Sequence, residues 1–206
     1  MIIGITGGTG SGKTTLLQCI ADMGGLILDC DAIYHELLRT SPALLDAIES
    51  RFPGAVTDGV LDRKKLGAEV FSDKNALEDL SAITHSAVKA EVLKRLEIKP
   101  ALAAIVAIGL FEGGLDALCD VTVAVTAPAQ DRVKRIMARD GISEEYARSR
   151  IAAQHPDEWF AGRCDYVLEN TGTPPDFRRK CLAFLGKEDI IKEKTKEHDH
   201  DKRRTP

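Results

Sequence analysis

Eight residues near the start of the chain have the types and the spacing of a loop that binds phosphate. Residues 7–14 read Gly-Gly-Thr-Gly-Ser-Gly-Lys-Thr and fit the pattern G-x-x-x-x-G-K-S/T. The glycines allow the backbone to curl, so that successive N–H groups converge on one anion. The ammonium group of Lys13 is suited to bridge the β- and γ-phosphates, and the hydroxyl group of Thr14 is suited to bind Mg²⁺. The motif therefore predicts binding of a nucleoside triphosphate.

The segments on either side of this loop are those that a phosphate-binding loop requires. The aliphatic residues 2–6 form a predicted strand, and residues 14–21 form a predicted helix whose N-terminus adds N–H donors. The element N/T-K-x-D, by which GTPases read guanine, begins at neither Asn75 nor Asn170. The residues predicted to contact the nucleotide are Gly8, Thr9, Gly10, Ser11, Gly12, Lys13, Thr14 and Thr15. We expect a kinase, with an acceptor site elsewhere in the chain.

Two carboxylates follow the second predicted strand, which covers residues 26–28. Asp29 and Asp31 are two residues apart, a spacing that directs both side chains the same way in an extended chain. Ligands bind at the carboxyl ends of the strands in an open parallel sheet. We predict that Asp31 accepts the proton of an attacking hydroxyl group, and that Asp29 orients a neighbour or holds water molecules on Mg²⁺. The alternative is that Asp31 caps the helix that follows.

Six basic residues surround the turn Asp140-Gly141 between two predicted helices. Kinases of this type often need a mobile segment with arginines that covers the phosphates and excludes water. Arg139 is the first candidate for a contact with the transferred phosphate, and Arg148 is the second. The alternative is a solvated charged surface, because Asp131, Glu144 and Glu145 are interleaved.

Short aliphatic runs alternate with helical patterns along most of the chain. Besides the two strands above, we predict strands at residues 102–108, 121–126 and 166–168, and helices at residues 31–38, 129–139, 144–153 and 176–185. The runs show little polar alternation, as expected for strands buried on both faces of a parallel sheet. Residues 41–97 contain several helical segments and no obvious strand. The pattern predicts an α/β doubly wound, five-stranded parallel sheet with a helical insert.

Composition limits the classes of function. The net charge of −4 argues against a general nucleic-acid binder. The five cysteines include no CxxC pair, which indicates reduced thiols rather than a disulfide framework or a zinc site. No targeting signal is evident, and the longest apolar run, residues 101–111, is too short to span a bilayer, so we expect a cytoplasmic protein without a membrane partner. A monomer and a small homo-oligomer both fit the sequence.

Several separated blocks occur in the order and spacing typical of one enzyme family. They are residues 4–15, 28–31, 58–63 with 70–73, 137–141 with 151–154, and 169–172. On these blocks the chain resembles the dephospho-CoA kinase family, whose members phosphorylate the ribose 3′-hydroxyl of dephospho-CoA. The resemblance runs from residue 1 to about residue 185.

The resemblance implies a P-loop kinase that uses ATP and Mg²⁺ and has dephospho-CoA as its acceptor. It implies a core of residues 1–40, 100–135 and 160–185, a substrate-binding insert of about residues 41–98, and a lid of about residues 136–158. From their composition, the charged residues 186–206 are expected to form a mobile tail. By position, the implied catalytic residues are Asp31, Lys13 and Arg139. The implied acceptor contacts are Asp29, Asp31, Arg63, His85, Phe111 and Glu112, and Asn170 and Gly172 lie in a turn near the adenine.

The sequence departs from the pattern of this family in three regions. The proline that follows the histidine is replaced by Ser86, residues 108–112 have lost a proline and a leucine, and Asp157 stands where the lid often has an arginine. Taken alone, His85 is more often a packed or capping histidine than a ligand. Two other readings stay open: another nucleoside monophosphate or small-molecule kinase, and a nucleotide-binding regulator without catalytic activity.

Overall fold

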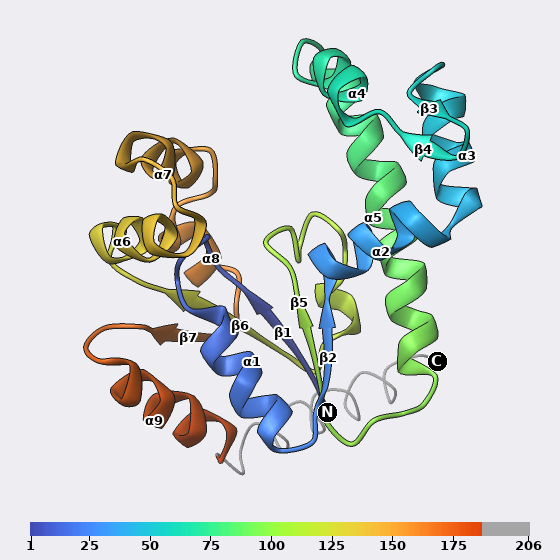
Figure 1. The fold of residues 1–206 in the computed structure, drawn as a ribbon. Coiled ribbons are helices and arrows are strands. Elements are labelled where there is room, and N and C mark those ends of the chain that lie inside the picture. Colours follow the sequence, from blue (N-terminus) through green and yellow to red (C-terminus); the bar gives the residue numbers. More distant parts are fainter. Residues whose placement is uncertain (187–206) are drawn as a thin grey trace, which may run out of the picture. The chain divides into compact units, whose positions relative to one another are not determined.

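A five-stranded sheet organises the first part of the molecule (Figure 1). The computed structural model describes residues 1–186, so the predicted tail lies outside the described residues apart from Gly186. The sheet has the order β2-β5-β1-β6-β7, and β1 pairs in parallel with β5 and β6, as β6 does with β7. Its strands are β1 Ile2–Thr6, β2 Leu26–Asp29, β5 Ala103–Val106, β6 Val121–Thr126 and β7 Tyr166–Glu169. The predicted α/β fold with five parallel strands is confirmed.

Helices cover both faces of this sheet. They are α1 Lys13–Asp22, α6 Ala129–Asp140, α7 Glu144–Ala152, α8 Asp157–Ala161 and α9 Pro174–Leu185, with a short 3₁₀ helix, η1, at Asp116–Leu118. After β1 the chain continues to β2 at one edge of the sheet, and after β6 it continues to β7 at the other edge. Because both crossovers are right-handed and run in opposite directions, α1 and α8 lie on opposite faces of the sheet. On its own face α1 packs against α9. The core there contains Ile3, Ile5, Leu16, Ile20, Val123, Val125 and Phe177.

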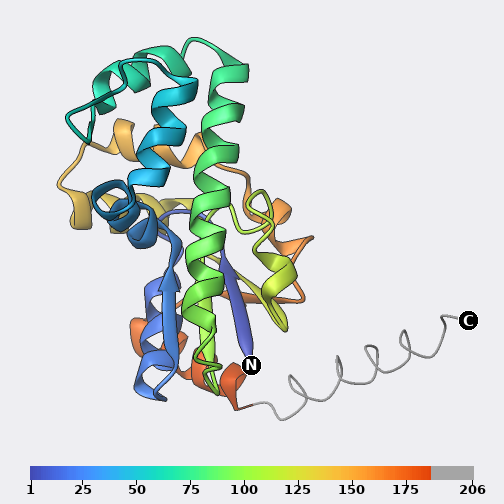
Figure 2. The same cartoon turned by 90° about the vertical axis from the view of Figure 1, so that its right-hand side faces the viewer.

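The chain divides into two compact units. The first comprises Met1–Ile27, Pro100–Leu110 and the chain from Leu115 onward, and the second comprises Leu28–Lys99 and Phe111–Gly114. The second unit is mainly helical, and its elements are α2 Cys30–Thr40, α3 Pro42–Arg51, β3 Val56–Thr57, β4 Val60–Leu61, α4 Arg63–Val70 and α5 Lys74–Leu96. The long helix α5 packs against α2, α3 and α4 (Figure 2). The core of this unit includes Leu44, Ile48, Phe52, Leu66 and Val70.

The prediction that residues 41–97 contain no strand is wrong. β3 and β4 form a two-stranded antiparallel hairpin, with Val56 opposite Leu61 and Thr57 opposite Val60. Asp58 and Gly59 form its turn, with φ angles of 52° and 74°. Two successive positive φ angles are typical of the tight turn that matches the twist of a hairpin, and the Asp-Gly pair favours it. The helix α8 was not predicted either, since it has only five residues.

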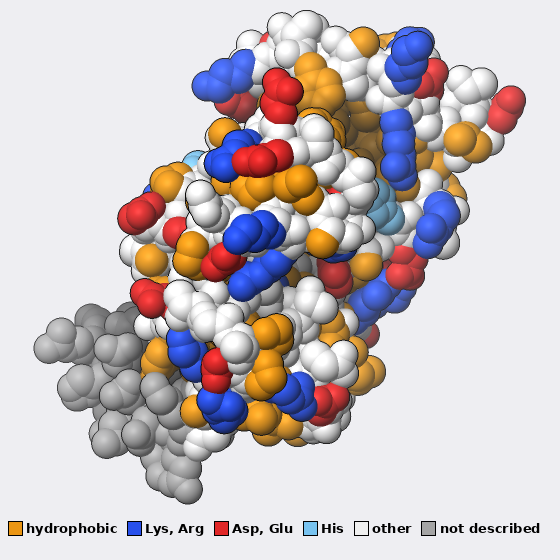
Figure 3. Space-filling model, turned by 60° about the vertical axis from the view of Figure 1, so that its left-hand side comes forward, with side chains coloured by type: hydrophobic (Ala, Val, Ile, Leu, Met, Phe, Trp, Pro, Cys, Tyr) orange, Lys and Arg blue, Asp and Glu red, His pale blue; other side chains and the backbone are white. Residues whose placement is uncertain are grey.

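Two further observations concern the surface and the hydropathy of the described residues. On the face shown in Figure 3, basic and acidic side chains lie side by side rather than in separate patches. Within residues 1–186, no helix is both long enough and apolar enough to cross a bilayer.

Candidate active site

Two residues of the loop between β1 and α1 have positive φ angles that only glycine adopts without strain. Gly7 has a φ of 129° where β1 ends, and Gly12 has a φ of 107° where α1 begins. Gly12 is the N-cap of α1, and no side chain caps this helix. The first turn of α1 also contains no acidic residue. The N–H groups and the positive end of the helix dipole are therefore directed toward the loop, and the first turn itself contributes no carboxylate to neutralise them.

Neighbouring elements approach this loop so closely that side chains larger than glycine do not fit. An ideal Cβ atom on Gly8 would overlap Nη2 of Arg132, and one on Gly12 would overlap Nδ2 of Asn170. Nδ2 of Asn170 donates to the carbonyl oxygen of Ser11 at 2.7 Å, and this amide is buried. The structure thus brings together the predicted loop residues and Asn170, although the contact is with the loop backbone.

The polar side chains of the loop differ in their surroundings. Nζ of Lys13 lies over the loop and donates to the carbonyl oxygens of Gly7 and Gly8, at 2.6 and 3.1 Å. Thr14 is exposed in the first turn of α1. Within residues 1–186, the Ser11 hydroxyl is fully buried and has no hydrogen-bond partner in the protein. A buried hydroxyl of this kind usually has a partner, so its position in the loop fits a site that holds a polar ligand.

Arg132 of α6 supports the loop from behind and was missed as a functional residue by the sequence reasoning. Its side chain is only 4% exposed. Nε donates to the carbonyl oxygen of Thr9 at 2.9 Å, Nη1 to Oδ1 of Asp157 at 2.9 Å, and Nη2 to Oε1 of Gln154 at 3.3 Å. Burial lowers the pKa of Arg132, and the charge of Asp157 opposes this shift. The guanidinium group stays charged, because the pKa of arginine is far above neutral pH.

Asp157 holds Arg132 in place. The sequence indicated only that Asp157 departs from the family pattern, and it did not predict this structural role. Besides the ion pair with Arg132, its Oδ2 accepts a hydrogen bond from the N–H of Ala127 at 3.2 Å. Asp157 thus links the start of α8 to the end of β6 and to the support of the phosphate loop. The only signal in the sequence was the change from arginine to aspartate, which does not reveal the partner.

Gln154 and Arg135 also contact the loop. The N–H of Thr9 donates to Oε1 of Gln154 at 2.8 Å, and Nε2 of Gln154 donates to Oγ1 of Thr9 at 2.7 Å. Nη1 of Arg135 donates to the carbonyl oxygens of Gly10 and Ser11, at 3.2 and 3.3 Å. The interpretation of the basic stretch as a solvated surface is thus wrong for Arg132 and Arg135.

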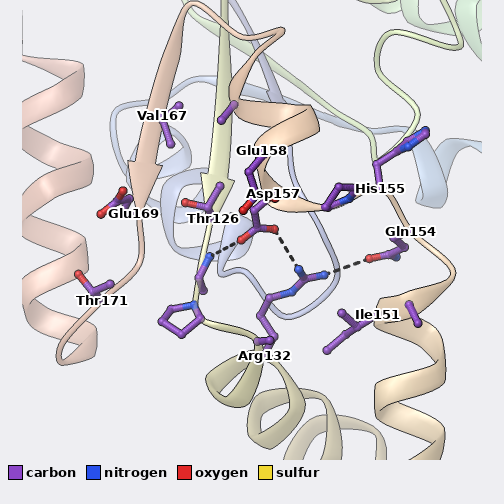
Figure 4. A pocket seen from close by; sticks show the side chains of 16 residues that line it. Thr126, Arg132, Ile151, Gln154, His155, Asp157, Glu158, Val167, Glu169 and Thr171 are labelled. Atoms are coloured by element: carbon purple, nitrogen blue, oxygen red, sulfur yellow. Dashed lines mark hydrogen bonds and ion pairs between the residues drawn. The ribbon is translucent and has the colours of Figure 1, made fainter.

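A cavity of about 850 Å³ lies beside Arg132, Gln154 and Asp157. In Figure 4, Asp157 and Gln154 lie on either side of the Arg132 guanidinium group. The far wall of the cavity comes from β7 and the turn after it, with Glu169 and Thr171. The cavity therefore adjoins the side chains that hold Thr9 in place.

The predicted lid arginines take part in ion pairs. Arg139 donates from Nε and Nη2 to the two carboxylate oxygens of Asp140, at 2.7 and 2.9 Å, and Arg150 donates to the same carboxylate at 2.6 Å. Hydrogen bonds from Arg139, and then from Arg150, lower the pKa of Asp140 to about 2. Arg148 pairs with Glu144 at 2.7 Å. Whether Arg139 contacts phosphate stays a prediction.

The prediction that Asp31 lies in extended chain is wrong. Helix α2 begins at Cys30, so Asp31 lies in its first turn while Asp29 ends β2. Oδ1 of Asp29 accepts hydrogen bonds from the N–H groups of Asp31 and Ala32, at 3.0 and 3.2 Å. Asp29 is therefore the N-cap of α2, and the alternative reading of Asp31 as the cap is also wrong. Both carboxylates are exposed.

The predicted acceptor residues belong to the second unit. Nη2 of Arg63, at the start of α4, lies 3.5 Å from Nδ1 of His35 on α2. His85 lies half-buried on α5, and one turn further along Nζ of Lys89 donates to the carbonyl oxygen of Gly114 at 2.9 Å. This bond attaches the segment Phe111–Gly114, which carries Phe111 and Glu112, to the same helix. Lys89 belongs to no motif, so the sequence did not indicate this contact.

The model of the dephospho-CoA kinase family matches residues 1–176. The chain belongs to this family. A dephospho-CoA kinase from Thermus thermophilus is 38% identical over 186 residues, which cover 90% of this chain and 90% of the relative. A crystal structure of a protein from Thermus thermophilus has a TM-score of 0.75 and 38% identity, and it covers 90% of this chain and 96% of its own. A dephospho-CoA kinase from Campylobacter jejuni has a TM-score of 0.63 and 28% identity, with 89% and 94% covered.

The loop of this family member fits the phosphates of a nucleotide. The glycine cradle, the uncapped N-terminus of α1 and Lys13 supply N–H donors and positive charge at one place. The resemblance proposed from the sequence blocks is confirmed, and with it the assignment as a kinase.

Proposed function

We propose that this chain transfers the γ-phosphoryl group of ATP to the ribose 3′-hydroxyl of dephospho-CoA, giving coenzyme A and ADP. The observation that carries the proposal is the family match over residues 1–176, because this range includes the phosphate loop and the acceptor segments. A reaction that consumes ATP also agrees with the cytoplasmic location expected from the sequence.

The phosphate loop would hold ATP as follows. The N–H groups of the loop and of the first turn of α1 bind the phosphates, and Lys13 exchanges its contacts with Gly7 and Gly8 for phosphate oxygens. The Thr14 hydroxyl is the proposed protein ligand of Mg²⁺, because it occupies the Ser/Thr position of the phosphate-loop motif and is exposed in the first turn of α1. When bound, Mg²⁺ neutralises charge that develops on the phosphates.

Asp31 is the proposed base for the acceptor hydroxyl. It is exposed in the first turn of α2, where Asp29 holds the helix start without using the side chain of Asp31. In a loose phosphoryl-transfer transition state, the base mainly aligns the nucleophile and accepts its proton late. An exposed carboxylate at a fixed helix start can do this. Arg139 is the proposed lid contact with the transferred phosphate.

The second unit is the proposed site of the acceptor. The helical insert of about residues 41–98 supplies Arg63 and His85, and the segment attached by Lys89 supplies Phe111 and Glu112. Asn170 and Gly172 are proposed to lie near the adenine of ATP, and residues 136–158 are proposed to form the lid. The cationic side chains Arg63 and Lys89 suit an acceptor that carries a pyrophosphate group.

Mass spectrometry of the reaction products tests the proposal. Purified protein, ATP, Mg²⁺ and dephospho-CoA should give coenzyme A together with an equal amount of ADP. The Lys13→Ala variant should give little of either product, because the loop loses the charge that holds the β- and γ-phosphates. ADP without phosphorylated dephospho-CoA would contradict the proposed acceptor. Equal ADP release by the Lys13→Ala variant would contradict the assignment of the loop.

A further inference from the structure

Thr9 is the residue of the phosphate loop that is most closely bound to another part of the chain. Its N–H and Oγ1 both bond to the side-chain amide of Gln154, and its carbonyl oxygen accepts from Nε of Arg132. These contacts cross 145 and 123 positions of the sequence. Thr9 is 8% exposed, and both its backbone N–H and its carbonyl oxygen are engaged in these hydrogen bonds.

The two residues that hold Thr9 lie before and after the segment 141–153. Arg132 lies on α6, before the segment 141–153 that contains α7, and Gln154 lies directly after it. Asp157, which begins α8, bonds to Arg132 and to the N–H of Ala127 at the end of β6. Side chains from before and after the segment 141–153 therefore contact a single residue of the phosphate loop.

The orientation of the Gln154 amide is determined by its partners. Oε1 receives two donors, the N–H of Thr9 at 2.8 Å and Nη2 of Arg132 at 3.3 Å. An amide turned by 180° would place its NH₂ group against these donors, so Nε2 has to face Oγ1 of Thr9. Arg132 thus fixes the side chain of Gln154, and Gln154 fixes the loop.

We propose that Gln154 is a positioning residue that couples the phosphate loop to the segment 141–153, so that nucleotide phosphate in the loop changes the arrangement of that segment. The inference rests on the proposed function for its ligand, ATP. Phosphates that draw on the N–H groups of the loop act on the backbone of Thr9, and the paired bonds transmit this change to Gln154. The hydrogen bond from Arg132 keeps the side-chain amide of Gln154 in the orientation that this transmission requires.

The chain contains a natural reporter for this coupling. His155, next to Gln154, stacks on Trp159 with ring centroids 3.9 Å apart and planes 6° apart, and Trp159 is the only tryptophan in the sequence. The guanidinium carbon of Arg163 lies 4.0 Å from the centre of the same tryptophan ring. A displacement of Gln154 changes this stack, and the fluorescence of Trp159 reports it.

The experiment compares Trp159 fluorescence and steady-state kinetics in a matched set of variants. Adding ATP to the wild type should change the emission, and Gln154→Ala should suppress the change while calorimetry still detects ATP binding. We expect kcat to fall about tenfold in Gln154→Ala, the scale of one or two lost hydrogen bonds. Thr9→Val, which removes Oγ1, should behave like Gln154→Ala, whereas Thr9→Ser, which keeps it, should retain the fluorescence response.

Gln18→Ala is the control, because Gln18 is exposed on α1 and bonds to Asp22 at 2.8 Å. It should keep the fluorescence response and the rate of the wild type. A purely structural role for Gln154 would lower the melting temperature and leave kcat, KM and the response of the folded molecules unchanged, and this result would overturn the inference. A wild type that binds ATP without any change at Trp159 would overturn it as well. Failure of the wild type to bind ATP at all would instead contradict the proposed function.

Discussion

The guanidinium group of Arg132 and the carboxylate of Asp157 form an ion pair of 2.9 Å behind the phosphate loop. The arginine side chain is 4% exposed and the aspartate side chain 25%, so the pair is largely removed from water. A charge buried in this way is stable only while its partner is present. The pair connects α6 with α8, and through Arg132 it reaches Thr9 of the loop.

Replacement of Asp157 should therefore destabilise the fold. We expect Asp157→Asn to lower the free energy of unfolding by about 2 kcal/mol, since the buried Arg132 loses its counter-charge. Chemical denaturation with and without the substitution measures this. Asp22→Asn is the matched control, because Asp22 pairs with Arg178 in an exposed ion pair. A loss no larger for Asp157→Asn than for Asp22→Asn would show that the buried pair contributes little.

Gly8→Ala tests how tightly the loop is packed. A Cβ atom at this position overlaps Nη2 of Arg132, whose side chain is held by three partners and cannot easily move. We expect weaker ATP binding and a lower melting temperature. Gly67→Ala is the control, since Gly67 lies within α4 and an added Cβ would come no closer than 3.5 Å to Phe71. That substitution should raise stability by up to about 1 kcal/mol, from helix propensity. Equal effects of the two variants would contradict the proposed packing.

Asp31→Asn separates catalysis from helix capping. The cap of α2 is Asp29, so the variant should keep its melting temperature and its affinity for ATP. We expect kcat to fall by about 10²-fold, the usual effect of losing a positioned acid–base group. Steady-state kinetics with dephospho-CoA measures this. A decrease of less than about fivefold, well below that range, would assign the base to another residue.

The sequence predicted well what depends on neighbouring residues and poorly what depends on distant ones. The motif that ends in Lys13 and Thr14 is local, and so are the aliphatic runs, so the loop and the strands of the sheet were predicted from pattern alone. The contact of Thr9 with Gln154 joins residues 145 positions apart, and no periodicity indicates it. The hairpin at Asp58 and Gly59 did carry a local signal, the Asp-Gly turn, which the helical interpretation of this region overlooked.

The error at Asp29 and Asp31 has a different cause. A strand and a helix meet there without a loop, because α2 begins at the residue after β2. The i, i+2 argument holds only for extended chain, and it fails once the second carboxylate enters a helical turn. The order Asp-x-Asp at a helix start is itself a capping signal, because the side chain of the first aspartate accepts N–H groups of the first turn.

The Arg139–Asp140–Arg150 ion pairs predict a specific response to acid. The pKa of Asp140 is lowered from its ordinary value of 3.8 to about 2, so its ionised form stabilises the fold above pH 4, and this contribution is lost as the pH falls toward 2. Asp140→Asn should be less stable than the wild type at neutral pH, and the two should converge between pH 4 and 2. Denaturation curves at several pH values measure the difference. Glu69→Gln, an exposed site on α4, is the control. A difference that stays constant down to pH 2 would contradict these ion pairs.

The identity of the acceptor is best tested by measuring ADP release with a panel of acceptors. The assay uses purified protein, ATP and Mg²⁺, and it compares kcat/KM for dephospho-CoA with values for nucleoside monophosphates and other small hydroxyl compounds. We expect dephospho-CoA to be turned over with by far the highest kcat/KM. Turnover of a nucleoside monophosphate together with none of dephospho-CoA would contradict it.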